Sequence, residues 1–244
     1  MEGSEKKRIS RLMVLVSILI VILCLFGCSS KSKEISQKPT NSLESNTDTK
    51  TTSAESKIQN IKLHLNKADI YGITVSYDNN YVAYVQGDPK NYEGQLYLWE
   101  INNSISKPVE GIKNQISSLI WSPNSKYLFV DSGTSIYRGG KIVNVAENEL
   151  MEEIRYIGSV NWSPDSNWIA IGLLSTIPPI TPTELNGTID MAVYNIQTKE
   201  KRIIEKATSE YDFIPRKWGN DWKIYYDKHY YNGKPMESMV YTFK

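Results

Sequence analysis

Residues 116–130 read ISSLIWSPNSKYLFV, and residues 159–171 read SVNWSPDSNWIAI. Each stretch has alternating apolar residues, then Trp-Ser-Pro-(Asn/Asp)-Ser, then a second apolar run with aromatic residues. Proline presets φ at the first central position of a tight turn, and Asn or Asp follows readily because its side chain bonds nearby backbone. The pattern therefore predicts a strand–turn–strand unit that occurs twice.

Two weaker copies of the unit extend the repeat. Residues 75–79 (VSYDN) and 218–221 (WGND) occupy the same frame as the turns at 121–125 and 162–166, and the four copies start 46, 41 and 56 residues apart. From residue 57 onward the apolar residues follow a period of two, with turn signals at short intervals. A period of 40 to 50 residues with several short strands per repeat is typical of one propeller blade.

The two strong copies, WSPNS and WSPDS, each followed by an aliphatic and aromatic strand, resemble the TolB-like, WD-repeat-like propeller repeat. This resemblance implies an all-β fold, a small β-propeller of about four blades. It carries information about architecture and very little about activity. The sequence predicts separate strands at 152–157 and 159–162, the last of blade two and the first of blade three.

The last blade has three predicted strands, and the alternating residues Ile58, Ile61, Leu63 and Leu65 precede blade one without a blade of their own. We therefore predict that an N-terminal strand at 58–65 pairs with the last strand and completes blade four. The alternative is an open arc that exposes strand edges and needs a partner to cover them.

The N-terminus has the layout of an export signal. A basic segment, KKRISR, is followed by an apolar run over residues 12–27, which ends in Leu25-Phe26-Gly27-Cys28. This ending resembles the lipobox of bacterial lipoproteins, which implies a signal peptide at 1–27, lipid attachment (palmitate) at Cys28 and a Gram-positive cell membrane, on its extracytoplasmic face. An uncleaved signal anchor is the alternative, although 16 apolar residues are few for a spanning helix.

The segment that follows is almost wholly polar. Residues 28–56 are rich in Ser, Thr, Lys and Glu and lack periodicity, so they predict a disordered tether. The propeller domain is expected at 57–244. Both cysteines, Cys24 and Cys28, precede this domain, which therefore has no disulfide or thiol chemistry.

Bulk composition excludes some functions. The net charge is +1, which gives no electrostatic support for nucleic-acid binding. With only two histidines, His64 and His229, and no cysteine in the domain, a zinc site is not expected, and no cofactor is predicted.

One short motif raises the question of catalysis. Asp131-Ser132-Gly133-Thr134 resembles the active-site loop of aspartic proteases, which needs two carboxylates that share a proton. No second copy of this motif occurs, and there is no G-x-S-x-G nucleophile motif. Glycan hydrolysis through a pair of loop carboxylates is the other enzymatic alternative.

A binding face is the more general expectation. In a propeller the loops between second and third strands emerge on one side, and here they are longer than the Trp-Ser-Pro turns on the opposite side. Loops on a rigid scaffold commonly carry function, although these loops also fit plain solvated hairpin tips. The candidate ligand residues on them are Asp88, Tyr92, Tyr137, Arg138, Glu184, Asp227, His229 and Tyr231.

The sequence thus predicts a surface-anchored, non-catalytic propeller that binds a protein, peptide or glycan of the cell envelope. Two alternatives stay open. One is a cell-envelope hydrolase, and the other is an incomplete propeller that serves as a subunit of a larger assembly.

Overall fold

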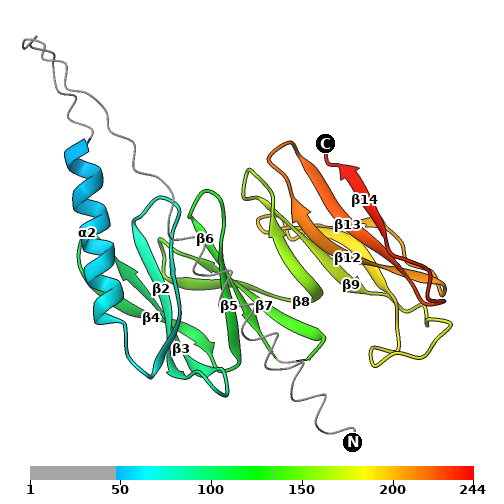
Figure 1. Cartoon of the computed structure of the whole chain (residues 1–244), viewed down its shortest axis with the longest axis horizontal. Coiled ribbons are helices and arrows are strands. Elements are labelled where there is room, and N and C mark those ends of the chain that lie inside the picture. Colours follow the sequence, from blue (N-terminus) through cyan, green and yellow to red (C-terminus); the bar gives the residue numbers. More distant parts are fainter. Residues whose placement is uncertain (1–47, 134) are drawn as a thin grey trace, which may run out of the picture. The chain divides into compact units, whose positions relative to one another are not determined.

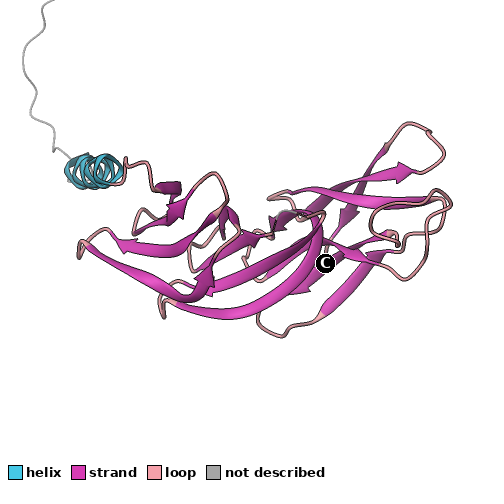
Figure 2. Cartoon of the chain, turned by 90° about the horizontal axis from the view of Figure 1, so that it is seen from below, coloured by secondary structure: helices cyan, strands magenta, loops and turns pink. Residues whose placement is uncertain are grey.

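A computed structural model describes residues 48–133 and 135–244, and strands make up most of this part of the chain (Figure 2). The predicted signal peptide, Cys28 and the tether up to residue 47 lie outside the described residues. Within the described part, no helix is long and apolar enough to cross a membrane.

The strands follow one another in four groups that correspond to the four repeats. Each group begins with the strand that leads into a repeat turn, as the sequence predicts. The first blade consists of β1 (Ile70–Val75), β2 (Tyr81–Asp88), β3 (Glu93–Glu100) and β4 (Ile105–Lys113). The second consists of β5 (Ile116–Trp121), β6 (Tyr127–Ser132), β7 (Tyr137–Asn144) and the first part of β8 (Glu149–Trp162). The third adds β9 (Trp168–Leu174), β10 (Ile189–Asn195) and β11 (Lys201–Glu205), and the fourth has β12 (Tyr211–Trp218), β13 (Lys223–Tyr230) and β14 (Glu237–Thr242).

Strand β8 joins blades two and three, so the two separate strands predicted at 152–157 and 159–162 form one strand. It pairs with β7 through its first part and with β9 through its last residues, which creates a seven-stranded sheet. The pairing with β9 shifts register between Ile157 and Asn161, where Gly158 has φ +78°. A glycine adopts this left-handed conformation at little cost. The chain therefore bends between blades without ending the strand.

The tryptophan of each repeat packs toward the preceding blade. Trp121 belongs to the buried cluster between blades one and two, Trp162 to the cluster between two and three, and Trp218 to the cluster between three and four. Large aromatic rings bury much apolar surface and fill the wedge between twisted sheets. The tryptophans of repeats two, three and four therefore fill the space between neighbouring blades.

Within the described residues no blade precedes blade one, and helix α2 (Asp48–His64) packs against the face that a preceding blade would cover. Figure 1 shows this helix alongside the strands of blade one. Its apolar residues Ile58 and Ile61, with Leu65 just beyond its end, pack into a cluster with Val75, the residue that aligns with the tryptophans. The prediction that 58–65 is a strand paired with the last strand is therefore wrong. Positions 58, 61 and 65 share one helical face, whereas Leu63 is 71% exposed.

The helix also changes the expected boundary of the tether. Residues 48–56, which the sequence assigns to a disordered segment, are helical. The apolar residues that hold this helix against blade one lie further along the chain, in residues 58–65. The sequence of the polar residues 48–56 alone therefore does not indicate a helix.

Serine side chains in the repeat turns link successive blades. Ser125 Oγ accepts a hydrogen bond of 3.1 Å from the Asp78 amide of blade one, and Ser166 Oγ accepts one of 3.0 Å from the Asn124 amide of blade two. Both serines adopt a positive φ, near 60°. Blade four has Trp222 at this position, whose indole cannot accept a hydrogen bond, so the series of links does not continue to it.

Candidate binding sites

Asp131 lies at the centre of a hydrogen-bonded group in blade two. The Arg138 guanidinium donates to both of its carboxylate oxygens at 2.7 Å, and the Tyr156 hydroxyl donates at 2.6 Å. Ser117 Oγ adds a further bond of 2.9 Å. Bidentate Arg–carboxylate pairs are among the stronger polar contacts in proteins, and Asp131 is only 9% exposed. The carboxylate is thus held as a charged acceptor.

Both side chains that donate to Asp131 from β7 and β8 have shifted pKa values. Burial, followed by the hydrogen bond to Asp131, raises the pKa of Tyr156 above its usual range. The hydrogen bonds to Asp131 raise the pKa of Arg138, against the opposing effect of burial. Burial is the largest cause of the Tyr156 pKa shift, whereas the hydrogen bonds to Asp131 are the largest cause of the Arg138 pKa shift. An aspartic protease instead needs a carboxylate that shares a proton with a second acid, and Asp131 is paired with a cation.

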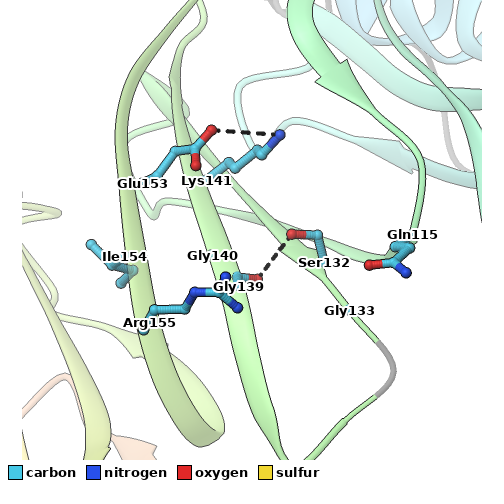
Figure 3. A pocket seen from close by; sticks show the side chains of 9 residues that line it. All are labelled: Gln115, Ser132, Gly133, Gly139, Gly140, Lys141, Glu153, Ile154 and Arg155. Carbon is cyan, nitrogen blue, oxygen red and sulfur yellow. Dashed lines mark hydrogen bonds and ion pairs between the residues drawn. The ribbon is translucent and has the colours of Figure 1, made fainter.

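A pocket of about 370 Å³ opens at the loop end of β6 and β7 (Figure 3). Its side chains alternate along the strands with Asp131, Arg138 and Tyr156, so the pocket lies on the other face of blade two from that group. Its walls come from the turn before β5, the end of β6 and the facing parts of β7 and β8. The lining residues are Gln115, Ser132, Gly133, Gly139, Gly140, Lys141, Glu153, Ile154 and Arg155. The wall is mainly polar, which suits a ligand with hydrogen-bonding groups.

The pocket carries one positive charge in excess. Lys141 Nζ lies 3.6 Å from Glu153, and the charge of Arg138 is balanced by Asp131. Within the described part of the chain, the Arg155 guanidinium has no carboxylate within ion-pair distance, and its cationic group lies 5.9 Å from the Tyr137 ring centroid. Arg155 therefore remains available to an anionic group, and Figure 3 shows its side chain reaching along the wall near Gly139.

Gly140 lets β7 pass closely over the core side chains of blade two. A Cβ atom at this position would lie 2.2 Å from Phe129 Cζ and 3.2 Å from Ile154 Cγ1. Phe129 is fully buried, so it has no room to move aside. Glycine is thus required where β7 crosses the core side chains of blade two.

A second polar group lies on blade four. Asp212 is 4% exposed and accepts hydrogen bonds from the Tyr231 hydroxyl at 2.6 Å, while its other oxygen lies 3.0 Å from His229 Nδ1. Burial and the bond to Asp212 raise the pKa of Tyr231 above its usual range. Asp212 and His229 face each other across β12 and β13, so the ladder register brings this pair together.

The remaining predicted ligand residues have local roles. Asp88 caps its own loop by accepting from the Lys90 amide and the Asn91 side chain. Asp227 pairs with Arg216 at 2.6 Å and accepts from Ser238. Tyr92 is 43% exposed at φ +56°, and Glu184 is exposed in the loop between β9 and β10.

The structure thus groups the predicted residues by blade. Tyr137 lies near Arg155 of the pocket, Arg138 holds Asp131, and His229 and Tyr231 meet at Asp212. Sequence reasoning missed Arg155, Tyr156 and Asp212. The outer strand containing Arg155 and Tyr156 was predicted, but a strand pattern does not show which charged residues find a partner. Among the described residues, no group of three or more His, Cys, Asp or Glu side chains could hold a metal ion.

Comparisons with known proteins identify the fold. No protein-family model matches the sequence, and no curated protein matches it. Solved structures do match. The β-propeller domain of the Trilobed protease from Pyrococcus furiosus, described as having an open velcro topology, is 15% identical over 72% of this chain and 55% of that chain, with a TM-score of 0.52. Prolyl oligopeptidase B from Galerina marginata is 11% identical over 81% of this chain and 33% of that chain, with a TM-score of 0.52. TolB from Acinetobacter baumannii is 13% identical over 71% and 41%, with a TM-score of 0.43.

Sequence identities this low carry information about the fold alone. The two matches with a TM-score of 0.52 show that the described chain has a β-propeller fold. The chain spans about half the length of the Trilobed protease propeller chain and a third of that of prolyl oligopeptidase B.

Proposed function

We propose that this protein is a non-catalytic binding propeller and that it holds an acidic group of an envelope peptide or protein in the pocket lined by Arg155 at the loop end of blade two. The observation that carries the proposal is the Arg155 guanidinium, which has no ion-pair partner among the described residues. Charge-assisted hydrogen bonds from a guanidinium to a carboxylate are geometrically selective. The pocket also contains the Gln115 amide and the Ser132 hydroxyl, which suit the other oxygens of a peptide.

The neighbouring ion pairs support a binding function over hydrolysis. Asp131 is engaged by Arg138 and Tyr156, so the carboxylate that resembles an aspartic-protease residue ties β6 to β7 and β8. The same three strands carry the pocket residues, and a rigid wall lowers the ordering cost of binding.

Arg155→Gln is expected to weaken binding of an acidic peptide about tenfold, because it removes a charge-assisted contact that contributes on the order of 1.5 kcal/mol. The measurement is fluorescence polarisation of the full chain with a labelled Ala-Ala-Glu peptide that has a free carboxyl terminus, compared with its amide. Arg155→Lys should recover part of the affinity.

Lys201→Gln is the matched control, since Lys201 is an exposed cation on β11 in blade three. It removes the same charge away from the pocket and should leave the affinity unchanged. Equal losses in Arg155→Gln and Lys201→Gln would show that general charge, rather than the pocket, attracts the peptide and would refute the proposal.

We also propose that the protein is lipid-anchored at Cys28 on the outer face of the cell membrane, a suggestion that depends on the sequence. Metabolic labelling with palmitate should mark the wild-type protein and the Cys24→Ala variant but not Cys28→Ala. The two cysteines are four residues apart in the same apolar segment, so Cys24→Ala controls for changes in export. Absence of label from all three proteins would favour the uncleaved anchor.

A further inference from the structure

The four repeat turns meet around a second pocket, of about 240 Å³. The third residue of each turn lines it, and these residues are Tyr77, Pro123, Pro164 and Asn220. In an antiparallel blade the first turn and the following hairpin lie at opposite ends of the shared strand. This pocket is therefore at the other end of the blades from the one that contains Arg155.

The wall of the repeat-turn pocket is aromatic and apolar. It includes Trp121, Trp162 and Trp218, together with the two prolines. The Trp162 indole N–H donates to the Ile120 carbonyl at 3.2 Å. The indole nitrogens of Trp121 and Trp218 are buried and have no hydrogen-bond partner among the described residues. The three tryptophans are 4–7% exposed, so they close the base of the pocket and offer it no accessible N–H group. The accessible apolar surface comes from Pro123, Pro164 and the ring of Tyr77.

Polar side chains and one exposed ring surround the opening. Tyr77 is 70% exposed and belongs to none of the buried clusters, so the fold does not require its ring. Asn161, Lys217 and Asn220 also line the pocket. The Asn161 amide bonds to Ser159 at 3.2 Å, which leaves its other donor and its oxygen for a ligand. Lys217 forms no ion pair among the described residues.

We propose that the repeat-turn pocket binds a neutral sugar ring of a glycan. The C–H face of a pyranose is apolar and can lie against the aromatic and proline surfaces, while asparagine amides both donate and accept, as sugar hydroxyls do. A proline-rich peptide also suits aromatic grooves, but its carbonyls need donors from the wall, and here the indole N–H groups are closed off. The pocket is small for a peptide and matches a ligand unit of sugar size.

The test is isothermal titration of the full chain, in a detergent that carries no sugar, with maltotriose and with triacetylchitotriose. Saturable binding of at least one trisaccharide is expected. Tyr77→Ala should weaken it about fivefold, the effect of losing roughly one aromatic contact. Asn220→Ala changes a second exposed residue of the pocket and should also weaken sugar binding. This variant tests the pocket even if Tyr77→Ala disturbs folding.

Tyr137→Ala is the matched control, because it removes a partly exposed tyrosine at the other pocket and should leave sugar affinity unchanged. The proposal is overturned if neither trisaccharide binds, if binding survives both pocket substitutions, or if a polyproline peptide binds more tightly than either sugar. The Arg155 variants affect only peptide binding, so failure of one proposal is distinguishable from failure of the other.

Discussion

Asp131→Ala is expected to lower the free energy of unfolding by about 3 kcal/mol. Removing the carboxylate leaves the Arg138 guanidinium and the buried Tyr156 hydroxyl without their acceptor, and breaking one side of a buried ion pair costs about 3–5 kcal/mol. The Arg138 side chain is 23% exposed, which places the effect at the lower end of that range. Urea denaturation monitored by tryptophan fluorescence gives the measurement.

Asp227→Ala is the matched comparison, since it removes another aspartate that pairs with an arginine. The Asp227 side chain is 15% exposed but its partner Arg216 is 50% exposed, so water screens the pair and its loss should cost about 1 kcal/mol, the upper end of the range for exposed pairs. Active-site residues often behave in the opposite way, because their replacement abolishes activity while stability is kept or raised. An Asp131→Ala protein as stable as wild type would therefore contradict the structural role and revive the hydrolase alternative.

Leu65→Ala is expected to destabilise the protein by about 3 kcal/mol, whereas Leu63→Ala should change stability by less than about 0.5 kcal/mol. Leu65 is 2% exposed and packs with Ile61 against blade one, whereas Leu63 is 71% exposed. A buried leucine loses both its transfer free energy and its packing when it is truncated. Thermal and urea unfolding of the two variants provide the comparison.

The same pair of residues tests the arrangement of helix α2. In a strand, residues two apart share a face, so a strand at 58–65 would bury both leucines or expose both. In the helix they point in different directions. Similar losses of stability in Leu63→Ala and Leu65→Ala would contradict the helical packing.

The repeats were readable from sequence because their information is local. The turn chemistry of Ser122, Pro123 and Asn124 appears directly in the structure, where Ser122 Oγ accepts from the Tyr127 amide at 3.0 Å and Asn124 accepts from Lys126. The strands on both sides follow the predicted alternation. Even the weak copies at 75–79 and 218–221 form equivalent turns, with Asn79 and Trp222 at φ near 60°.

The helix at the N-terminal side was missed because its pattern is ambiguous. Ile61, Leu63 and Leu65 alternate as in a strand, and Ile58, Ile61 and Leu65 are spaced as in a helix. The choice between them depends on what the apolar residues can pack against. Blade one has an apolar face formed by Val75, Val82 and neighbouring residues, and a helical stripe covers it.

The candidate sites were predictable as a region but not as residue groups. The loop end of blade two was expected to carry Tyr137 and Arg138, and there Tyr137 lies near Arg155 while Arg138 holds Asp131. Partners such as Asp131 with Arg138, seven residues apart, or Asp212 with His229, seventeen apart, depend on the strand register. The spacing of residues along the sequence does not indicate which charged side chains form pairs.

The sequence by itself determined the all-β repeat, its turns and the positions of the interblade tryptophans, because these follow from local backbone preferences and from periodic burial. Only the tertiary structure decided that a helix covers blade one, that Arg138 pairs with Asp131 and that Arg155 has no ion-pair partner among the described residues. It also brought four distant turns to one pocket. These outcomes depend on contacts between residues far apart in the chain, and no local pattern contains them.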